Sequence, residues 1–263
     1  MQRNVFTKTL WDQRRALLAW MIGIAVATTV YASFYPTMRN PEMEAAMANY
    51  PQVMMDAFGF QDLVSPAGYL AGTVFGIIGP VLLIIFTTGI GAQAIAGEEE
   101  SGRLDLLLAY PVSRTRVVLQ RFAALVVATL LLGGAMLLVL FALTGPAELE
   151  IPPGHLAAMV LHLVLLGICF GALALALGAA FGRRGLALAV AAVTGVSTYF
   201  ANTLAPQSAS LAWLQDVSPF HYYAGGQPLR NGLQFGDATI LLVVSVVLVA
   251  AGTLSFSRRD VAV

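Results

Sequence analysis

The chain has 263 residues, of which 58% are hydrophobic and 11% are charged, and its 14 basic residues balance 14 acidic residues. Because soluble domains carry about 25% charged residues, this composition excludes a soluble enzyme, a nucleic-acid-binding protein and a disordered regulator. The mean hydropathy of +0.79 predicts an all-α integral membrane protein with a single transmembrane domain over residues 1–263.

Six stretches are apolar over the length of about 20 residues that a helix needs to cross a bilayer. In chain order, the predicted spans cover residues 16–35, 69–96, 122–144, 155–181, 186–204 and 238–256. The first is expected to be a retained helix, because no small-residue cleavage site follows its apolar run. Pro80 predicts a kink in the second span, since proline removes a backbone donor and clashes with the preceding turn.

Lysine and arginine lie almost entirely on one side of this layout. Twelve of them lie in the N-terminal segment, the loop between the second and third spans, the turn between the fourth and fifth spans, and the C-terminal segment. The other side holds only Arg39 and Arg230. Because cytoplasmic loops carry an excess of positive charge, both termini are expected in the cytoplasm.

Two segments on the outer side, residues 36–65 and 205–235, are predicted to be amphipathic. The first mixes acidic and aromatic residues with several methionines, among them those at positions 43, 47, 54 and 55. This mixture favours a short helix on the outer leaflet over a methionine copper site. The second places Trp213 and several other aromatic residues near prolines, which is typical of an interfacial or re-entrant piece.

Ionisable residues are nearly absent from the spans, and His162 is the one clear case. Ion-coupled carriers need such groups at mid-depth, so an ion-coupled carrier is disfavoured. A hydrogen bond to a neighbouring helix, or a position near the outer interface, is favoured for His162 over a proton or metal role. The single cysteine, Cys169, excludes an intrachain disulfide and a cysteine zinc site. We therefore predict neither a catalytic residue nor a metal site.

Weakly polar side chains within the spans are candidates for bridging helices or for lining a substrate path. These candidates are Thr87, Thr88, Gln93, Ser197, Thr198 and Asn202. Packing between helices is the favoured role of any one of them. As a set, they suit helices that shift against one another around an apolar or amphipathic cargo.

The most distinctive stretch, residues 97–114, follows the second span. Three acidic residues, Glu98 to Glu100, precede Gly102 and a run of leucines. A short helix is expected from Leu104 to Tyr110, because Pro111 disfavours a helical residue before it. A helix this short cannot bury its leucines alone. It therefore needs the groove of a partner protein or the inner leaflet, and the resemblance described next favours the partner protein.

This stretch resembles the coupling helix of ABC-2 type permeases, the membrane subunits of bacterial ATP-binding-cassette exporters. The matching residues are Glu98, Glu99, Glu100, Gly102, Arg103, Leu104, Asp105, Leu107, Pro111, Val112, Ser113 and Arg114. The resemblance implies a multi-pass protein of the bacterial cytoplasmic membrane with six spans and both termini cytoplasmic. It also implies docking positioned by the three glutamates and Arg103, with Leu104, Leu107 and Leu108 filling the partner's groove.

The partners implied by this resemblance are two copies of an ABC ATPase subunit and a second permease, by default an identical one in a homodimer, within membrane lipid. The sequence lacks a phosphate-binding loop, and its only lysine is Lys8. Such a loop needs its own lysine. The chain is therefore not an enzyme by itself and carries no cofactor. ATP and Mg²⁺ are expected on the partner ATPase.

The uncharged spans favour a hydrophobic or amphipathic substrate, such as a drug, an antibiotic or a lipid-like compound, over a small ion. A permease for cofactor maturation or for envelope lipid handling remains an alternative. A stand-alone carrier is less favoured, since it does not need an apolar helix after the second span. A CAAX-type intramembrane protease is also less favoured. Glu98, Glu99 and Arg103 match one of its elements, but the three histidines lack the spacing of its others.

Overall fold

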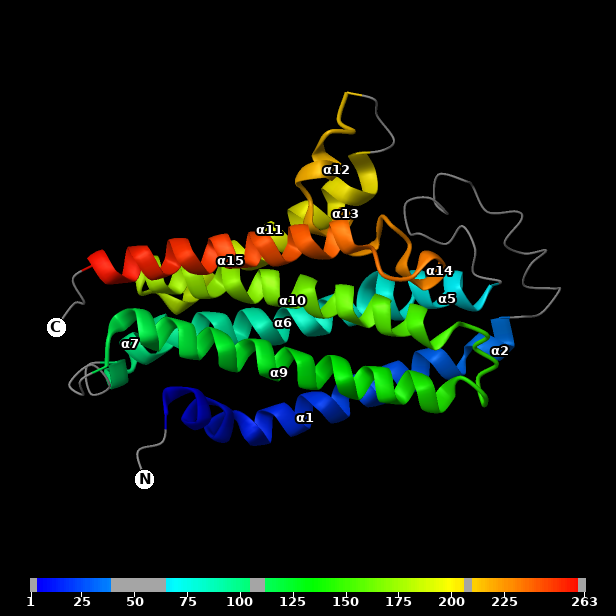
Figure 1. Cartoon of the computed structure of the whole chain (residues 1–263), viewed down its shortest axis with the longest axis horizontal. Coiled ribbons are helices and arrows are strands. Elements are labelled where there is room, and N and C mark those ends of the chain that lie inside the picture. The colour runs from blue at the N-terminus through cyan, green and yellow to red at the C-terminus, as the bar shows by residue number, and fades with distance from the viewer. Residues whose placement is uncertain (1–3, 39–64, 105–111, 206–209, 260–263) are drawn as a thin grey trace.

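The computed structural model describes residues 4–38, 65–104, 112–205 and 210–259. All regular structure in these ranges is helical, and six helical stretches are long and apolar enough to cross a membrane. The predicted all-α fold with six transmembrane helices is therefore confirmed. The six stretches run roughly side by side in an elongated bundle (Figure 1).

Five of the six spans are each built mainly on one long helix, and the second span is divided into five consecutive pieces. The long helices are α1 (Val5–Ser33), α9 (Arg114–Leu143), α10 (Pro153–Phe181), α11 (Arg184–Leu204) and α15 (Phe235–Arg258). The second span comprises α5 (Pro66–Gly72), η1 (Val74–Ile78), α6 (Gly79–Ala92), η2 (Gln93–Gly97) and α7 (Glu98–Glu100), where η1 and η2 are π-helical. Short helices complete the described chain: α2 (Tyr35–Met38), α12 (Leu214–Val217), α13 (Pro219–Ala224) and α14 (Pro228–Asn231).

Local sequence signals set several of these helix ends. The Ser113 hydroxyl accepts a hydrogen bond from the backbone N–H of Arg116 and caps the start of α9. Pro153 occupies the first turn of α10, where its missing N–H costs nothing. Gly182 ends α10 in the left-handed conformation, with a φ of 66°, which glycine adopts without strain.

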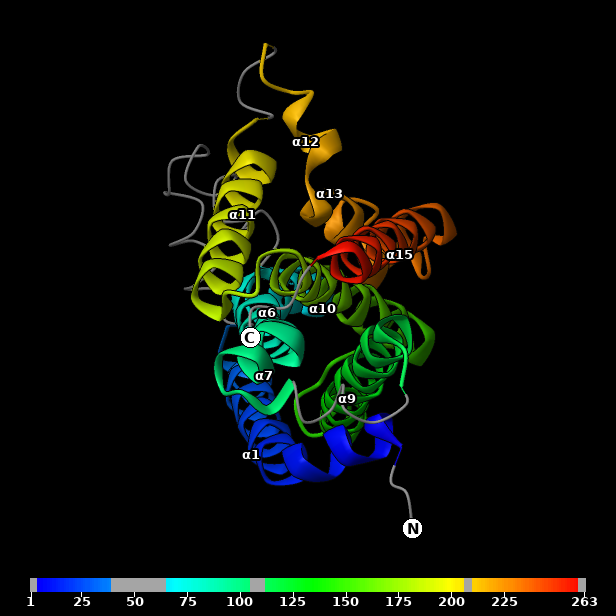
Figure 2. The same ribbon diagram turned by 90° about the vertical axis from the view of Figure 1, so that its left-hand side faces the viewer.

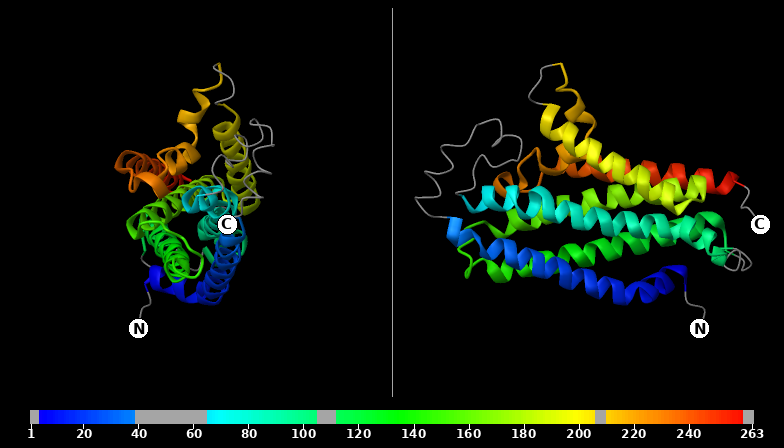
Figure 3. Two further views of the ribbon diagram at one scale, coloured as in Figure 1. Left: turned by 90° about the vertical axis from the view of Figure 1, so that its right-hand side faces the viewer. Right: turned by 180° about the vertical axis from the view of Figure 1, so that it is seen from behind.

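Helix α10 lies at the centre of the bundle, with α6, α9, α11 and α15 around it (Figure 2). In its most apolar stretch 78% of the residues are buried, against 17% in α11. Helix α11 diverges from the bundle toward α12 (Figure 3). Most of its apolar surface therefore remains open to lipid or to another protein.

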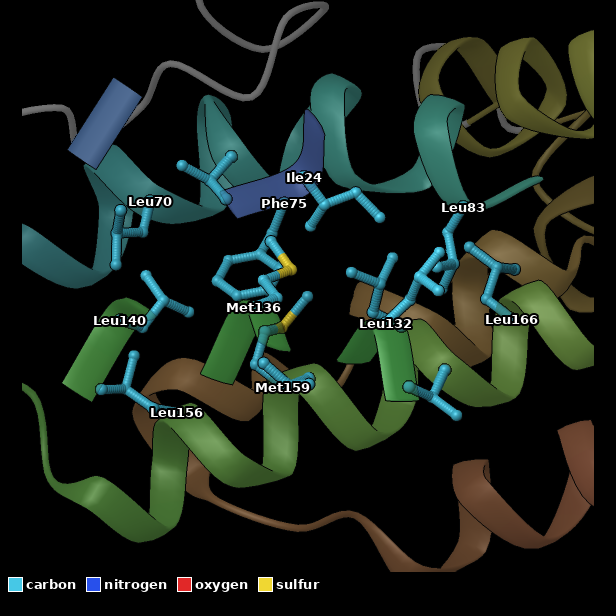
Figure 4. Close-up of a cluster of buried hydrophobic side chains, with 14 of the residues drawn as sticks. Ile24, Leu70, Phe75, Leu83, Leu132, Met136, Leu140, Leu156, Met159 and Leu166 are labelled. Atoms are coloured by element: carbon cyan, nitrogen blue, oxygen red, sulfur yellow. The ribbon is translucent and has the colours of Figure 1, made fainter. Parts of the chain in front are cut away.

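Two neighbouring features hold α6 against α10. Large apolar side chains fill the interior between α1, α6, α9 and α10, and they include Ile24, Leu83, Leu132, Met136 and Leu166 (Figure 4). Further toward η2, a methyl group added at Gly91 would overlap the backbone oxygen of Gly171. The two backbones therefore touch, as small residues allow in membrane helices.

The π-helical segment η1 lies directly before the predicted kink at Pro80. In η1 the backbone N–H of Gly79 donates to the oxygen of Val74, five residues back. The next oxygen in this register, that of Phe75, would need the N–H of residue 80, which proline lacks. The hydroxyl of Tyr223 in α13 donates to this Phe75 oxygen at 2.8 Å. A residue about 150 positions away in the sequence thus compensates for the missing donor.

The two outer segments differ in how much of them is described. The predicted helix and the methionines of residues 36–65 lie almost entirely outside the described residues. Residues 205–235 contain α12, α13 and α14, and α13 and α14 pack on α10. Whether this segment is re-entrant in a bilayer stays a prediction.

Candidate functional site

The predicted docking residues that the structure describes lie at the end of the bundle where α1 begins and α15 ends (Figure 1). We call this end, formed by the starts of α1, α9 and α11, the segment α7 and the end of α15, the basic end. Its placement in the cytoplasm stays a prediction. The described chain reaches Leu104 and resumes at Val112. The predicted coupling helix, with Asp105, Leu107, Leu108 and Pro111, therefore lies outside the described residues.

Glu98 contacts two arginines of its own chain. Its carboxylate lies 3.3 Å from the guanidinium of Arg103 and 3.5 Å from that of Arg121 in α9. The side chain of Arg121 is 11% exposed, and the carboxylate of Asp12 in α1 adds a second negative charge near it. Arg103 is mostly exposed. Glu98 therefore connects the end of the second span to the third.

Glu99 forms an ion pair with Arg259, directly after α15. Gly182 packs against this pair, since a methyl group added there would lie 2.8 Å from both carboxylate oxygens. On the other side, the guanidinium of Arg114 donates to the backbone oxygens of Phe256 and Arg259. The pair is therefore enclosed by the ends of the second, fourth and sixth spans and by the start of the third.

Glu100 caps the fifth span. Its carboxylate accepts a hydrogen bond of 2.8 Å from the backbone N–H of Arg184, at the start of α11. The first N–H groups of a helix lack partners within the helix, and negative charge is favourable there. All three glutamates that we predicted to position a partner thus have partners within the chain itself.

Leu104 lies inside the core of the protein rather than on its surface. It is 1% exposed and belongs to a cluster with Ile95, Val117, Val118 and Phe256. This position does not fit the predicted role of Leu104 in filling a partner's groove. Leu104 anchors the beginning of the loop between the second and third spans.

The predicted substrate-path residues lie on two helices and in different surroundings. In α6, the hydroxyls of Thr87 and Thr88 donate to carbonyl oxygens of their own helix. In α11, Thr198 does the same, while the backbone oxygen of Asn202 accepts from the Gln215 side chain. Of the other two, Gln93 lies in η2 and Ser197 in α11.

A small apolar cavity lies elsewhere, between α1, η1, α6, α9 and α10. Its lining includes Ile24, Thr28, Val74, Leu132, Met136 and Leu163. None of the six predicted substrate-path residues borders it. A cavity of this lining suits an apolar group and offers little to a charged one.

His162 is fully buried in α10, and its Nδ1 lies 3.1 Å from the backbone oxygen of Tyr222 in α13. This contact agrees with the predicted hydrogen bond to a neighbouring element. Its Nε2 has no hydrogen-bond partner among the described residues. Those residues hold no group of three or more histidine, cysteine or acidic side chains that could bind a metal ion. Cys169 is buried, as expected for a small core residue.

Sequence reasoning did not find the intrachain roles of Glu99, Glu100 and Tyr223. The family resemblance assigned the glutamates to a partner, and the tyrosine was attributed to the membrane interface. The sequence carried one signal of the glutamate contacts: three acidic residues follow the second span, and arginines lie at the ends of other spans.

The chain matches the family of ABC-2 family transporter proteins over residues 3–261. It is also 40% identical over 89 residues to the probable ABC transporter permease protein NosY of Pseudomonas aeruginosa, a match that covers 32% of each chain. The aligned part therefore spans about a third of this relative's length. Since the family match covers nearly the whole sequence and the structure has six apolar helices, this multi-pass membrane protein belongs to the ABC-2 family and is a permease of an ABC transporter.

Proposed function

We propose that this chain is the membrane subunit of an exporter that moves a hydrophobic or amphipathic compound across the bacterial cytoplasmic membrane. ATP hydrolysis on a separate ATPase subunit drives the movement. The observation that carries this proposal is the family match over residues 3–261 in a sequence whose only lysine, Lys8, leaves no phosphate-binding loop. The near absence of ionisable residues from the spans supports an apolar cargo over an ion.

The basic end is the surface that we assign to the ATPase. Glutamates 98 to 100 are engaged within the chain, while several arginines of this end are exposed: Arg103, Arg116, Arg183, Arg184 and Arg258. Such a surface is complementary to an acidic one. Leu107 and Leu108 then supply the apolar contacts with the ATPase. Leu104 holds the beginning of the coupling segment in place.

A second copy of this chain completes the transporter in this proposal. The apolar surface of α11 supports it, because Val193, Val196 and Phe200 are all more than half exposed. A second α11 or membrane lipid would cover such a face.

Co-purification tests the assembly. The tagged chain, extracted from its host in mild detergent, is expected to carry an ATPase subunit in equal amount, with an intact mass that fits two copies of each. A clean complex without a nucleotide-binding subunit contradicts the proposal.

A substitution tests the contact between the coupling segment and the ATPase. Leu107→Glu is expected to abolish ATPase co-purification while the chain still inserts in the membrane, because the change places a charge in an apolar contact. Thr37→Glu adds the same charge at an exposed site in α2, at the opposite end of the bundle, and is expected to leave co-purification unchanged. Equal recovery of the ATPase with both variants would show that Leu107 does not contribute to ATPase binding.

The cargo is tested by ATP turnover of the complex in lipid nanodiscs. Apolar or amphipathic compounds are expected to stimulate turnover, and inorganic ions are not. Stimulation by inorganic ions alone would contradict the apolar cargo. A purified complex that flips labelled lipid and ignores drugs would instead favour the envelope-lipid alternative.

A further inference from the structure

We propose that Glu99 and Arg259 form an intramolecular clamp that holds the basic end closed and opens in each transport cycle. The clamp joins the end of the second span to the residue that follows the sixth. This inference rests on the proposed function, because ATP hydrolysis on the partner supplies the energy that opens it.

The clamp lies where several spans meet. Gly182, in the turn between α10 and α11, packs on the ion pair. Arg114 holds the backbone of Phe256 and Arg259, and the Arg114 guanidinium lies 5.4 Å from the centre of the Phe256 ring. An outward shift of Glu99 therefore also disturbs the contacts of the third, fourth and sixth spans.

The ion pair keeps some contact with solvent, and one of its buried polar atoms lacks a hydrogen bond. The side chains of Glu99 and Arg259 are 15% and 20% exposed, so water reaches both when they separate. The Nε of Arg259 is buried without a hydrogen-bond partner among the described residues. An incompletely satisfied buried charge weakens the closed arrangement. This suits a contact that opens and closes rather than a permanent one.

A π-helical segment lies directly before the clamp. Helix α6 touches α10 at Gly91, and η2, whose Ala96 packs near Gly178 of α10, separates α6 from the three glutamates. The Gln93 side chain packs over Gly97 in η2, where an added methyl group would overlap it. π-Helical turns are rare and are concentrated at functional sites. Conversion of such a turn to α-helix shifts the following residues by one position, a rotation of about 100°.

Force from the ATPase would reach this clamp through Leu104. The loop that we assign to the dock begins within a few residues of Glu99 and is anchored by the buried Leu104. Displacement of the loop therefore acts on Leu104 and on the nearby clamp before it acts on η2 and α6, which lie further from it along the chain. The spans can then shift only after Glu99 and Arg259 separate.

A reversible covalent lock tests this proposal. Glu99→Cys and Arg259→Cys are combined in the chain, assembled with its ATPase in nanodiscs and treated with a short thiol cross-linker that a reductant cleaves. We expect an intrachain cross-link, at least a tenfold loss of ATP turnover, and recovery after reduction. The wild-type chain is a reagent control, because its single cysteine, Cys169, is buried.

A second cross-link controls for any effect that a cross-link has on turnover regardless of its position. Thr115→Cys with Leu119→Cys joins two exposed positions one turn apart within α9, and this lock is expected to leave turnover unchanged. A complex locked at 99 and 259 that hydrolyses ATP at the normal rate would overturn the clamp. A failure of the two cysteines to cross-link would also overturn it, because the closed state requires them to be adjacent.

A charge swap tests whether the attraction between Glu99 and Arg259, rather than their other contacts, is what turnover requires. Glu99→Arg and Arg259→Glu are each expected to lower turnover, and the double variant is expected to regain most of it. If no ATPase co-purifies, the proposed function itself fails. If the ATPase is present and the locked complex turns over normally, the clamp alone is wrong.

Discussion

Gly91→Ala is expected to separate α6 from α10, because the contact at this position is between backbones. The added methyl group would overlap the carbonyl oxygen of Gly171 and lie 3.1 Å from the backbone nitrogen of Leu175. A backbone atom cannot rotate away as a side chain can. The two helices must therefore move apart by about 1 Å, and a gap of that size forfeits a quarter to a half of the dispersion energy of the atoms that line it.

The expected cost is roughly 1–3 kcal/mol, the range found for overpacked cores. For a chain of this size that corresponds to a fall in the unfolding temperature of about 2–12 °C. Thermal unfolding in mild detergent measures it. Gly89→Ala is the matched control, since an added methyl group there meets nothing within 4 Å. That variant is expected to unfold at the wild-type temperature or slightly above it, because alanine favours helix over glycine. Equal shifts in the two variants would refute the backbone contact.

Three further substitutions test other contacts by the same thermal assay. Gly133→Ala should cost about 1–2 kcal/mol, because the methyl group meets a valine of α10, and Gly134→Ala, which meets nothing, should not. Tyr223→Phe should cost about 1–2 kcal/mol through a lost buried hydrogen bond, whereas Tyr222→Phe loses only an exposed one. Glu100→Ala should cost about 1 kcal/mol by uncapping α11, and no change would show that the cap contributes nothing.

The apolar pattern of the sequence was sufficient to predict the six spans. In a bilayer every backbone group must be satisfied within the segment, so about 20 apolar residues leave few alternatives to a helix. The pattern does not reveal where α1 begins. The structure extends this helix back to Val5, because the polar residues before position 16 continue the same helix outside the apolar stretch.

The contacts at the basic end were not predictable in the same way. A sequence shows that Glu98 to Glu100 are charged, but their partners come from α9, α11 and the end of α15, and their proximity depends on how the helices pack. Leu104 illustrates the same limit. A leucine beside charged residues suits either a partner's groove or the protein's own core, and only the packing of α9 and α15 around it decides between them.

The hydrogen bond from Tyr223 to Phe75 leads to a prediction about Pro80. If the missing N–H of proline is what leaves the Phe75 oxygen free, Pro80→Ala supplies a backbone donor in the same turn and reduces the need for the tyrosine hydroxyl. Tyr223→Phe should then cost less in the Pro80→Ala background than in the wild type, by about 0.5–1.5 kcal/mol. A double-mutant cycle measured by unfolding in detergent gives this difference directly. Equal costs in the two backgrounds would mean that the hydroxyl does not replace the proline's missing donor. The π-helical segment would then need another explanation.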